Sequence, residues 1–229
     1  MQICPSILEY KDTDYLSTIK KLSPHYKYFQ IDFADGKYVD NKTATIDSFI
    51  NQFTTGNFKS SVNLQTLKTL VFDFHLMVKE YEEYIKKIEI LKDFLNIKNI
   101  FIHFDLSPNL SLLSKKYIYP IGLVLNPQDQ IDDLARKYNL KNVPFIQIMS
   151  IVPGAQGKPF IPETINKVEQ LRQLGYRSNI FLDGAVNDKT LPIINSYKFK
   201  PDFICPGSFL AKSPDNDLSN RVKYLLEFN

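Results

Sequence analysis

The chain has 229 residues, of which 44% are hydrophobic and 23% charged, and its formal net charge is +3. This composition excludes a disordered chain and predicts one well-packed domain over residues 1–229. The lysines are interspersed with acidic residues, and no apolar run is long enough to cross a bilayer. We therefore expect a cytoplasmic protein without nucleic-acid or membrane partners, and a small anionic substrate is compatible with the charge.

The two cysteines, Cys4 and Cys205, lie in short apolar runs and are each followed by proline. This setting favours two buried thiols in a reducing compartment. A disulfide or a thiolate nucleophile is less favoured, because neither cysteine belongs to a metal or redox motif.

Eight short apolar runs alternate with longer amphipathic stretches along the chain. In order, the runs span residues 2–6, 28–32, 71–77, 99–105, 121–126, 145–150, 179–184 and 202–208. Strands that are buried on both faces read as apolar runs and are typical of parallel sheets, whose strands are usually connected by helices.

The stretches between the runs have helical patterns. Residues 161–175 place Pro162 in a first turn and Gly175 as a stop, and residues 81–95 repeat apolar positions at helical spacing. The predicted core positions of these two helices are Ile165, Val168, Leu171 and Leu174, and Ile85, Ile88, Leu91 and Leu95. Eight strand-helix units predict an α/β fold, a (β/α)8 TIM barrel. Residues 54–70 are too long for a minimal connection and predict an inserted loop or short helix.

Most of the runs end in a polar side chain. In a barrel these side chains form one ring at the carboxyl ends of the strands, where active sites of this fold lie. The ring consists of Ser6, Asp32, His75, Asp105, Asn126, Ser150, Asp183 and Ser208.

Two carboxylates of this ring are candidates for proton chemistry. Gln30 and Asp32 share one strand face, so Gln30 lies just beneath Asp32. Closure of the barrel brings Asp183 across the mouth, with His75 between the two carboxylates. Such a set can hold a divalent cation and move protons. A purely structural role explains any one of these residues, but it explains the set poorly.

Glycine turns follow the last three predicted strands, at residues 152–160, 183–186 and 206–209. Glycine lets backbone N–H groups approach a phosphoryl group, and the last strands of this fold often bind phosphate. Because the chain has only eight glycines, three such turns favour a phosphate site.

The chain is similar to the ribulose-phosphate 3-epimerase family nearly from end to end. The resemblance is carried, in chain order, by "CPSIL", "IDFADGKYVDN", "FHLMV", "GLVLNP", "MSIVPGAQGKPFIPE", "LDGAVN" and "PGSFL". It implies a barrel of the ribulose-phosphate-binding type and an epimerase that interconverts D-ribulose 5-phosphate and D-xylulose 5-phosphate, or acts on a related ketose phosphate. It also implies a homo-oligomer.

The resemblance assigns roles to individual residues. Asp32 and Asp183 are implied to be the paired acid and base at C3 and, with His75, to bind one divalent metal ion, for which zinc, iron, manganese and magnesium are the candidates. The implied substrate-binding residues are Ser6, Met77, Met149, Gly154, Gly157, Gly184, Ala185, Gly207 and Ser208.

The chain departs from the family pattern at several positions. Gln30 stands where the family motif His-x-Asp-x-Met-Asp-Gly has a metal-binding histidine, so Gln30 is predicted to be a weak or lost ligand. Ala34 stands in place of the methionine of that motif, and Ala185 in place of the second glycine of a phosphate loop.

Two other functions remain open at this point. One is a sugar-phosphate-binding barrel with altered or lost catalysis. The other is a metal-independent decarboxylase, because residues 35–40 spell Asp-x-Lys-x-x-Asp; however, this spelling falls in the loop after the second strand, where Lys37 is more simply solvated. His25 is expected to be exposed, and His103 is expected to be structural and outside the site.

Overall fold

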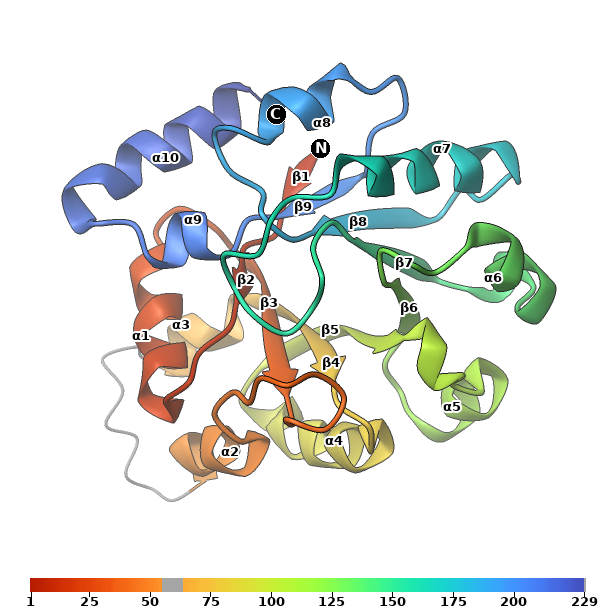
Figure 1. Cartoon of the computed structure of the whole chain (residues 1–229). Helices are drawn as coiled ribbons and strands as arrows, with labels where there is room; N and C mark the ends of the chain where they lie inside the picture. Colours follow the sequence, from red (N-terminus) through yellow and green to blue (C-terminus); the bar gives the residue numbers. More distant parts are fainter. Residues whose placement is uncertain (55–63, 229) are drawn as a thin grey trace.

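The computed structural model describes residues 1–54 and 64–228, and its strands form one parallel sheet (Figure 1). The strands are β1 (Gln2–Ile3), β2 (Ser6–Ile7), β3 (Tyr28–Ala34), β4 (Val71–Met77), β5 (Asn96–His103), β6 (Ile121–Leu125), β7 (Phe145–Met149), β8 (Asn179–Asp183) and β9 (Phe203–Cys205). Each lies within or close to one of the eight predicted runs.

The first predicted run forms two short strands, β1 and β2, which close the sheet. Gln2 pairs with Phe203 of β9, and Ser6 pairs with Gln30 of β3. The switch of partner occurs at Pro5, which has no N–H to continue a ladder and whose carbonyl accepts a hydrogen bond from the Gln30 N–H at 2.9 Å. One continuous stretch of chain therefore joins both ends of the sheet, which confirms the predicted TIM barrel.

Helices follow the strands and cover the outside of the barrel (Figure 1). The α-helices are α1 (Asp12–Leu22), α2 (Ile46–Thr54), α3 (Leu64–Lys68), α4 (Tyr81–Ile88), α5 (Leu110–Lys116), α6 (Ile131–Lys137), α7 (Asn166–Gln173), α8 (Leu191–Ser196), α9 (Ser208–Ala211) and α10 (Asp215–Glu227). Short 3-10 helices are η1 (Glu89–Asp93), η2 (Phe104–Leu106), η3 (Leu140–Asn142) and η4 (Pro162–Ile165). None of the helices in the described ranges has both the length and the apolar character needed to span a membrane.

The predicted helical stretches are largely confirmed. Residues 81–95 form α4 and η1, and all four of their predicted core side chains are buried. Residues 161–175 form η4 and α7, but Leu174 was wrongly placed in the core and is 52% exposed. The helix ends at Gln173, so Leu174 leaves the buried face. Of the predicted insertion at 54–70, α3 and the end of α2 are helical, and residues 55–63 lie outside the described part.

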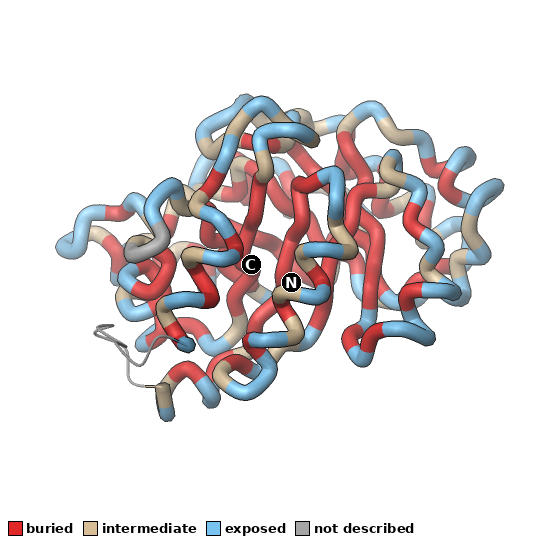
Figure 2. The backbone as a smooth tube through the Cα atoms, turned by 90° about the horizontal axis from the view of Figure 1, so that it is seen from below, coloured by how far each residue is buried: buried red, intermediate tan, exposed pale blue. Residues whose placement is uncertain are grey.

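Buried strands fill the middle of the molecule, while the helices present exposed residues to the outside (Figure 2). Inside the barrel, four rings form what we call the aromatic plug: Phe101, Phe145, Phe181 and Phe203. The rings of Phe181 and Phe203 stack with centroids 4.4 Å apart. A Cβ at Gly122 would lie 2.1 Å from the Phe145 ring, so glycine is required there for the plug to pack. The plug closes the floor beneath the carboxyl-terminal mouth.

Candidate functional site

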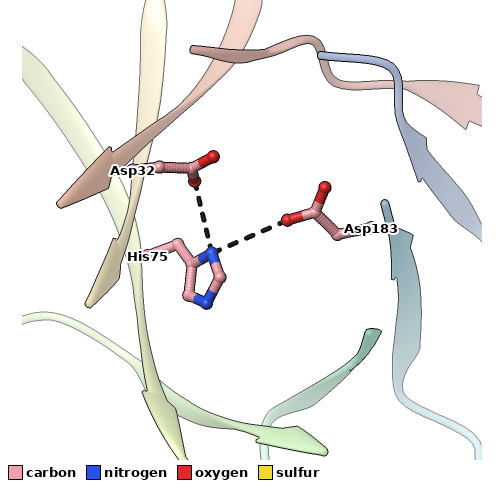
Figure 3. A group of neighbouring side chains, drawn as sticks. All are labelled: Asp32, His75 and Asp183. Atoms are coloured by element: carbon pink, nitrogen blue, oxygen red, sulfur yellow. Dashed lines mark hydrogen bonds and ion pairs between the residues drawn. The ribbon is translucent and has the colours of Figure 1, made fainter. Parts of the chain in front are cut away.

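Three predicted site residues meet at the mouth of the barrel (Figure 3). Asp32 and His75 are paired in register on β3 and β4, while Asp183 reaches them from β8. His75 Nδ1 lies 3.3 Å from Asp32 Oδ1 and 3.6 Å from Asp183 Oδ2. All three side chains are buried, and their ligand atoms lie within 4.8 Å of one another. Two carboxylates and an imidazole nitrogen at this spacing fit a divalent cation.

Gln30 lies beneath the two carboxylates and is fully buried. Its Nε2 donates hydrogen bonds to Asp32 Oδ1 and Asp183 Oδ2, both at 2.9 Å. Its Oε1 points instead toward the Cys205 thiol at 3.9 Å. In this arrangement Gln30 offers the carboxylates a donor and does not direct an oxygen into the space between them.

A second glutamine, Gln147, supports the same site and was not singled out from the sequence. Its Nε2 donates to Asp183 Oδ2 at 3.1 Å from strand β7, and its Oε1 has no partner among the described residues. Gln147 precedes the predicted site residue Met149 by two residues, just as Gln30 precedes Asp32. Because residues two apart on a strand share a face, this spacing could have predicted that Gln147 points into the barrel. Asp183 Oδ2 therefore accepts from two buried amides.

The surroundings of Asp183 raise the pKa of its carboxyl group into the neutral range. Burial and then the neighbouring Asp32 carboxylate raise the pKa of Asp183 to about 7, although His75, Gln30 and Ser6 act in the opposite direction. A carboxyl group with a pKa near the working pH exchanges its proton effectively in either direction. Asp183 can thus hold a proton at neutral pH.

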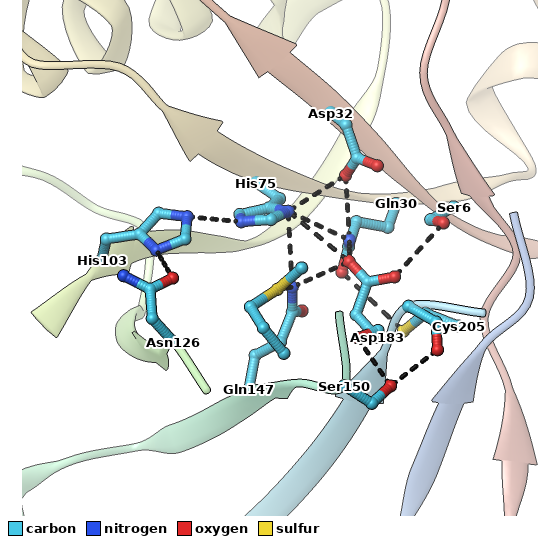
Figure 4. Close-up of polar contacts among 12 residues, drawn as sticks. Ser6, Gln30, Asp32, His75, His103, Asn126, Gln147, Ser150, Asp183 and Cys205 are labelled. Carbon is cyan, nitrogen blue, oxygen red and sulfur yellow. Dashed lines mark hydrogen bonds and ion pairs between the residues drawn. The ribbon is translucent and has the colours of Figure 1, made fainter. Parts of the chain in front are cut away.

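His103 contacts the site more closely than the sequence indicated (Figure 4). Its Nε2 lies 2.9 Å from His75 Nε2, and its Nδ1 lies 3.0 Å from Asn126 Oδ1. Burial and the neighbouring His75 lower the pKa of His103 well below its usual range. The neutral ring of His103 therefore supports His75 from behind. The sequence did not predict this contact, because His103 lies inside an apolar run.

A cavity of 550 Å³ lies above the carboxylates. Asp32, His75, Asp183 and every predicted substrate-binding residue line it, the latter being Ser6, Met77, Met149, Gly154, Gly157, Gly184, Ala185, Gly207 and Ser208. Gln30 lies below the cavity and does not line it.

One end of the cavity combines glycine turns with cations. Gly184 and Ala185 have φ of +116° and +52°, and within the described residues the N–H groups of Ala185 and Ser208 make no backbone hydrogen bond. Lys212 and Arg221 also line the cavity and lie next to the Ser208 turn, where the Lys212 N–H donates to the Ser208 carbonyl and Arg221 donates to the Phe209 carbonyl. Arg221 is ion-paired with Asp217 at 2.6 Å. The sequence did not predict these two cations, because they come from the turn after α9 and from α10, beyond the strand-end motifs.

The other members of the predicted ring lie outside the cavity. Ser150 donates to the carbonyls of Asp183 and Gly184 at 3.0 and 2.6 Å and so supports their turn. Asn126 bonds to His103. Asp105 was predicted to close a strand at the mouth, but β5 ends at His103 and Asp105 is an exposed residue of η2.

The remaining side chains of interest lie away from the chemistry. Lys37 and His25 are exposed, and Lys37 does not line the cavity. Asp35 accepts hydrogen bonds from the backbone of Lys37 and Tyr38, so this stretch forms a structural turn. Cys4 and Cys205 are free and buried, as predicted.

Comparisons with known proteins point to one family. The model of the ribulose-phosphate 3 epimerase family matches residues 2–208. A ribulose-phosphate 3-epimerase from Helicobacter pylori is 27% identical, with 96% of this chain and 94% of that protein covered. One from Methanocaldococcus jannaschii is 26% identical, with 87% and 78% covered.

Solved structures with a similar fold include two sugar-phosphate enzymes. They are 3-keto-L-gulonate-6-phosphate decarboxylase from Vibrio cholerae (TM-score 0.62, 9% identity, 100% of this chain and 97% of that chain covered) and 3-hexulose-6-phosphate synthase from Salmonella typhimurium (TM-score 0.62, 8% identity, 100% of both covered). At these identities the likeness concerns the fold alone.

Proposed function

Because the chain belongs to the ribulose-phosphate 3-epimerase family, an isomerase class, we propose that it interconverts D-ribulose 5-phosphate and D-xylulose 5-phosphate, or a closely related pair of ketose phosphates. The observation that carries this proposal is the pair of buried carboxylates, Asp32 and Asp183, that face each other through His75 beneath the cavity.

Inversion at C3 needs a proton acceptor on one face of the sugar and a proton donor on the other. Asp32 and Asp183 come from β3 and β8, which are separated in the closed sheet by β9 and the β1–β2 stretch, so a substrate in the cavity above them can present a different face to each. Asp32 removes the C3 proton as a base, and Asp183, whose pKa is about 7, returns a proton from the far side. In the reverse reaction the two residues exchange roles. The amides of Gln30 and Gln147 keep both carboxylates oriented.

Asp32, His75 and Asp183 would hold one divalent cation, because their ligand atoms are close enough to share one. When bound, the cation supplies Lewis-acid stabilisation of the negative charge that develops on the sugar oxygens. Zinc, iron, manganese and magnesium are the candidates, and Gln30 is a weak or lost fourth ligand as its amide is oriented here.

The far end of the cavity would bind the phosphate of the ketose. The N–H groups of Ala185 and Ser208, which make no backbone hydrogen bond within the described residues, supply donors, and the Lys212 ammonium supplies opposite charge. Arg221 lies beside them but is ion-paired with Asp217 at 2.6 Å. Other residues of the cavity wall would contact the rest of the substrate: Ser6, Met77, Met149, Gly154, Gly157, Gly184 and Gly207. A homo-oligomer in the cytoplasm stays a prediction from the sequence.

Solvent deuterium incorporation at C3 of ribulose 5-phosphate, followed by NMR with Mn²⁺, Zn²⁺ or Fe²⁺ and without metal, tests the proposal. We expect metal-dependent exchange that is lost in Asp32→Asn and in Asp183→Asn. Absence of exchange with every metal, with hexulose 6-phosphates also inert, would contradict epimerase activity. Binding of ribulose 5-phosphate without exchange would then identify a sugar-phosphate-binding protein.

A further inference from the structure

We propose that His103 is a positioning residue that holds the proton of His75 on Nε2, so that Nδ1 of His75 faces Asp32 and Asp183 as a bare nitrogen ready to bind a metal ion. The proposal rests on the metal site of the proposed function. It concerns the direction of the hydrogen bonds along a chain of side chains that runs inward from the exposed Asp105 through Tyr38, Asn126 and His103 to His75. Figure 4 shows its inner part, from Asn126 to His75.

The direction of this chain is set at its outer end by Asp105. An ionised carboxylate only accepts hydrogen bonds, so Tyr38 donates its hydroxyl hydrogen to Asp105 Oδ1 at 2.8 Å. The Tyr38 oxygen is then left to accept from Asn126 Nδ2, also at 2.8 Å. Asn126 Nδ2 lies 3.4 Å from Asp105 Oδ2 as well. Both contacts require the amide nitrogen of Asn126 on this side.

The orientation of Asn126 determines the tautomer of His103. With the amide nitrogen directed outward, Asn126 Oδ1 lies 3.0 Å from His103 Nδ1. An amide oxygen only accepts, so His103 carries its proton on Nδ1. The neutral His103 ring then has a bare Nε2.

The bare Nε2 of His103 determines the proton position on His75. The two Nε2 atoms are 2.9 Å apart, so a hydrogen bond between them must be donated by His75. In the neutral His75 ring this places the only proton on Nε2. Nδ1 is left without a proton, 3.3 Å from Asp32 Oδ1 and 3.6 Å from Asp183 Oδ2.

This arrangement opposes the competing tautomer of His75. Two carboxylates beside Nδ1 would otherwise favour a proton on that nitrogen, where it would block metal binding. The hydrogen bond to His103 offsets this preference, and so do the amide donors Gln30 Nε2 and Gln147 Nε2, which lie 3.5 and 3.4 Å from Nδ1. Residues that orient a metal-binding histidine typically change metal affinity by roughly 10- to 100-fold when they are replaced.

The ring tautomers can be read directly from ¹⁵N shifts in long-range ¹H–¹⁵N spectra of the full chain at about pH 8, above the ordinary histidine pKa. The chain has three histidines, so single replacements assign them. We expect opposite tautomers in the metal-free protein, with the proton on Nε2 of His75 and on Nδ1 of His103. A proton on Nδ1 of His75 would overturn the proposal without any variant.

Two variants separate positioning from packing. His103→Gln keeps a carbonyl oxygen that accepts from His75 Nε2, whereas His103→Leu fills similar space without an acceptor. Calorimetric titration with Zn²⁺ should show affinity near that of the natural chain for His103→Gln and a loss of roughly 10- to 100-fold for His103→Leu. Equal affinities in both variants would overturn the proposal. These measurements contain no sugar, so failure of epimerase activity alone would leave them unchanged.

Discussion

Asp183 and Asp73 are two buried carboxylates at different depths in the same barrel, and comparing them shows which surroundings mark a candidate functional residue. Asp183 lies at the mouth and Asp73 lies deeper, on strand β4 two residues before His75. Burial is the largest cause of a raised pKa in both, and each reaches a pKa of about 7. Their protonation behaviour alone does not distinguish them.

The surroundings of the two carboxylates differ completely. Asp73 accepts a hydrogen bond from the Tyr28 hydroxyl, which also accepts from Asn99 Nδ2 at 3.0 Å, and it does not line the cavity. Asp183 lines the cavity and faces a second carboxylate and a histidine. A perturbed pKa therefore indicates function only where a substrate can reach the group and a partner residue is poised beside it.

The largest expected effect is a difference in C3 exchange activity between variants of Asp183 and of Asp73. Asp183→Asn removes a proton-transfer group and should lower C3 exchange by roughly 10²- to 10⁴-fold. Asp73→Asn keeps an acceptor for Tyr28 and should leave exchange close to that of the natural chain. The NMR exchange assay measures both, and a comparable loss in Asp73→Asn would show that the deeper carboxylate takes part in the chemistry.

A second change tests how tightly the aromatic plug is packed. Gly122→Ala brings a methyl group into the Phe145 ring and carbonyl, and we expect a loss of about 3 kcal/mol in the free energy of unfolding. Urea denaturation measures this loss. The double variant with Phe145→Leu should be less destabilised than the sum of the single changes, and simple additivity would argue against the clash.

The deeper carboxylate should also be visible in the pH dependence of stability. Folded Asp73 has a pKa of about 7 against an ordinary aspartate pKa of 3.8, so between about pH 4 and pH 7 the folded state binds more protons. The free energy of unfolding then falls as pH rises through this window, by at most about 1.4 kcal/mol per pH unit. The difference between the natural chain and Asp73→Asn isolates this slope, because Asp183 is present in both. A flat difference curve would contradict the raised pKa.

The smallest expected effect is a change in stability caused by a substitution at the mouth of the barrel. Ala185 holds a left-handed conformation with φ of +52°, which costs a residue with a Cβ about 1 kcal/mol more than glycine. Ala185→Gly should therefore stabilise the protein by up to about 1 kcal/mol in thermal or urea denaturation. The control Ala34→Gly, in the buried strand β3, should lose stability instead. A destabilised Ala185→Gly would mean that the methyl group makes favourable contacts.

The sequence predicted those features that depend on the residues of one strand alone. Buried parallel strands are continuous apolar runs, so their number and order were readable, and polar residues that end such runs, such as Asp32 and Asp183, stood out. The split of the first strand was not readable, because it depends on which neighbour Pro5 meets after the barrel closes.

The residues that were missed depend on contacts between strands or on distant helices. Gln147 and His103 lie inside apolar runs, and their polar atoms find partners only when β4, β5, β7 and β8 converge. Lys212 and Arg221 follow the last strand and carry no recognisable spacing. Asp105 failed as a site residue for the opposite reason, since the strand stops two residues before it.

Within the described residues, the aromatic plug fills the barrel beneath the mouth. Phe101, Phe145, Phe181 and Phe203 seal the floor, so in the described part of the chain the cavity is the side from which water reaches Asp32 and Asp183. A ketose phosphate bound in that opening would close its own reaction chamber. A proton taken from C3 would then stay on the carboxylates until the sugar leaves. The rate at which deuterium enters C3 would then report how often the sugar is released, and not how often a proton is transferred.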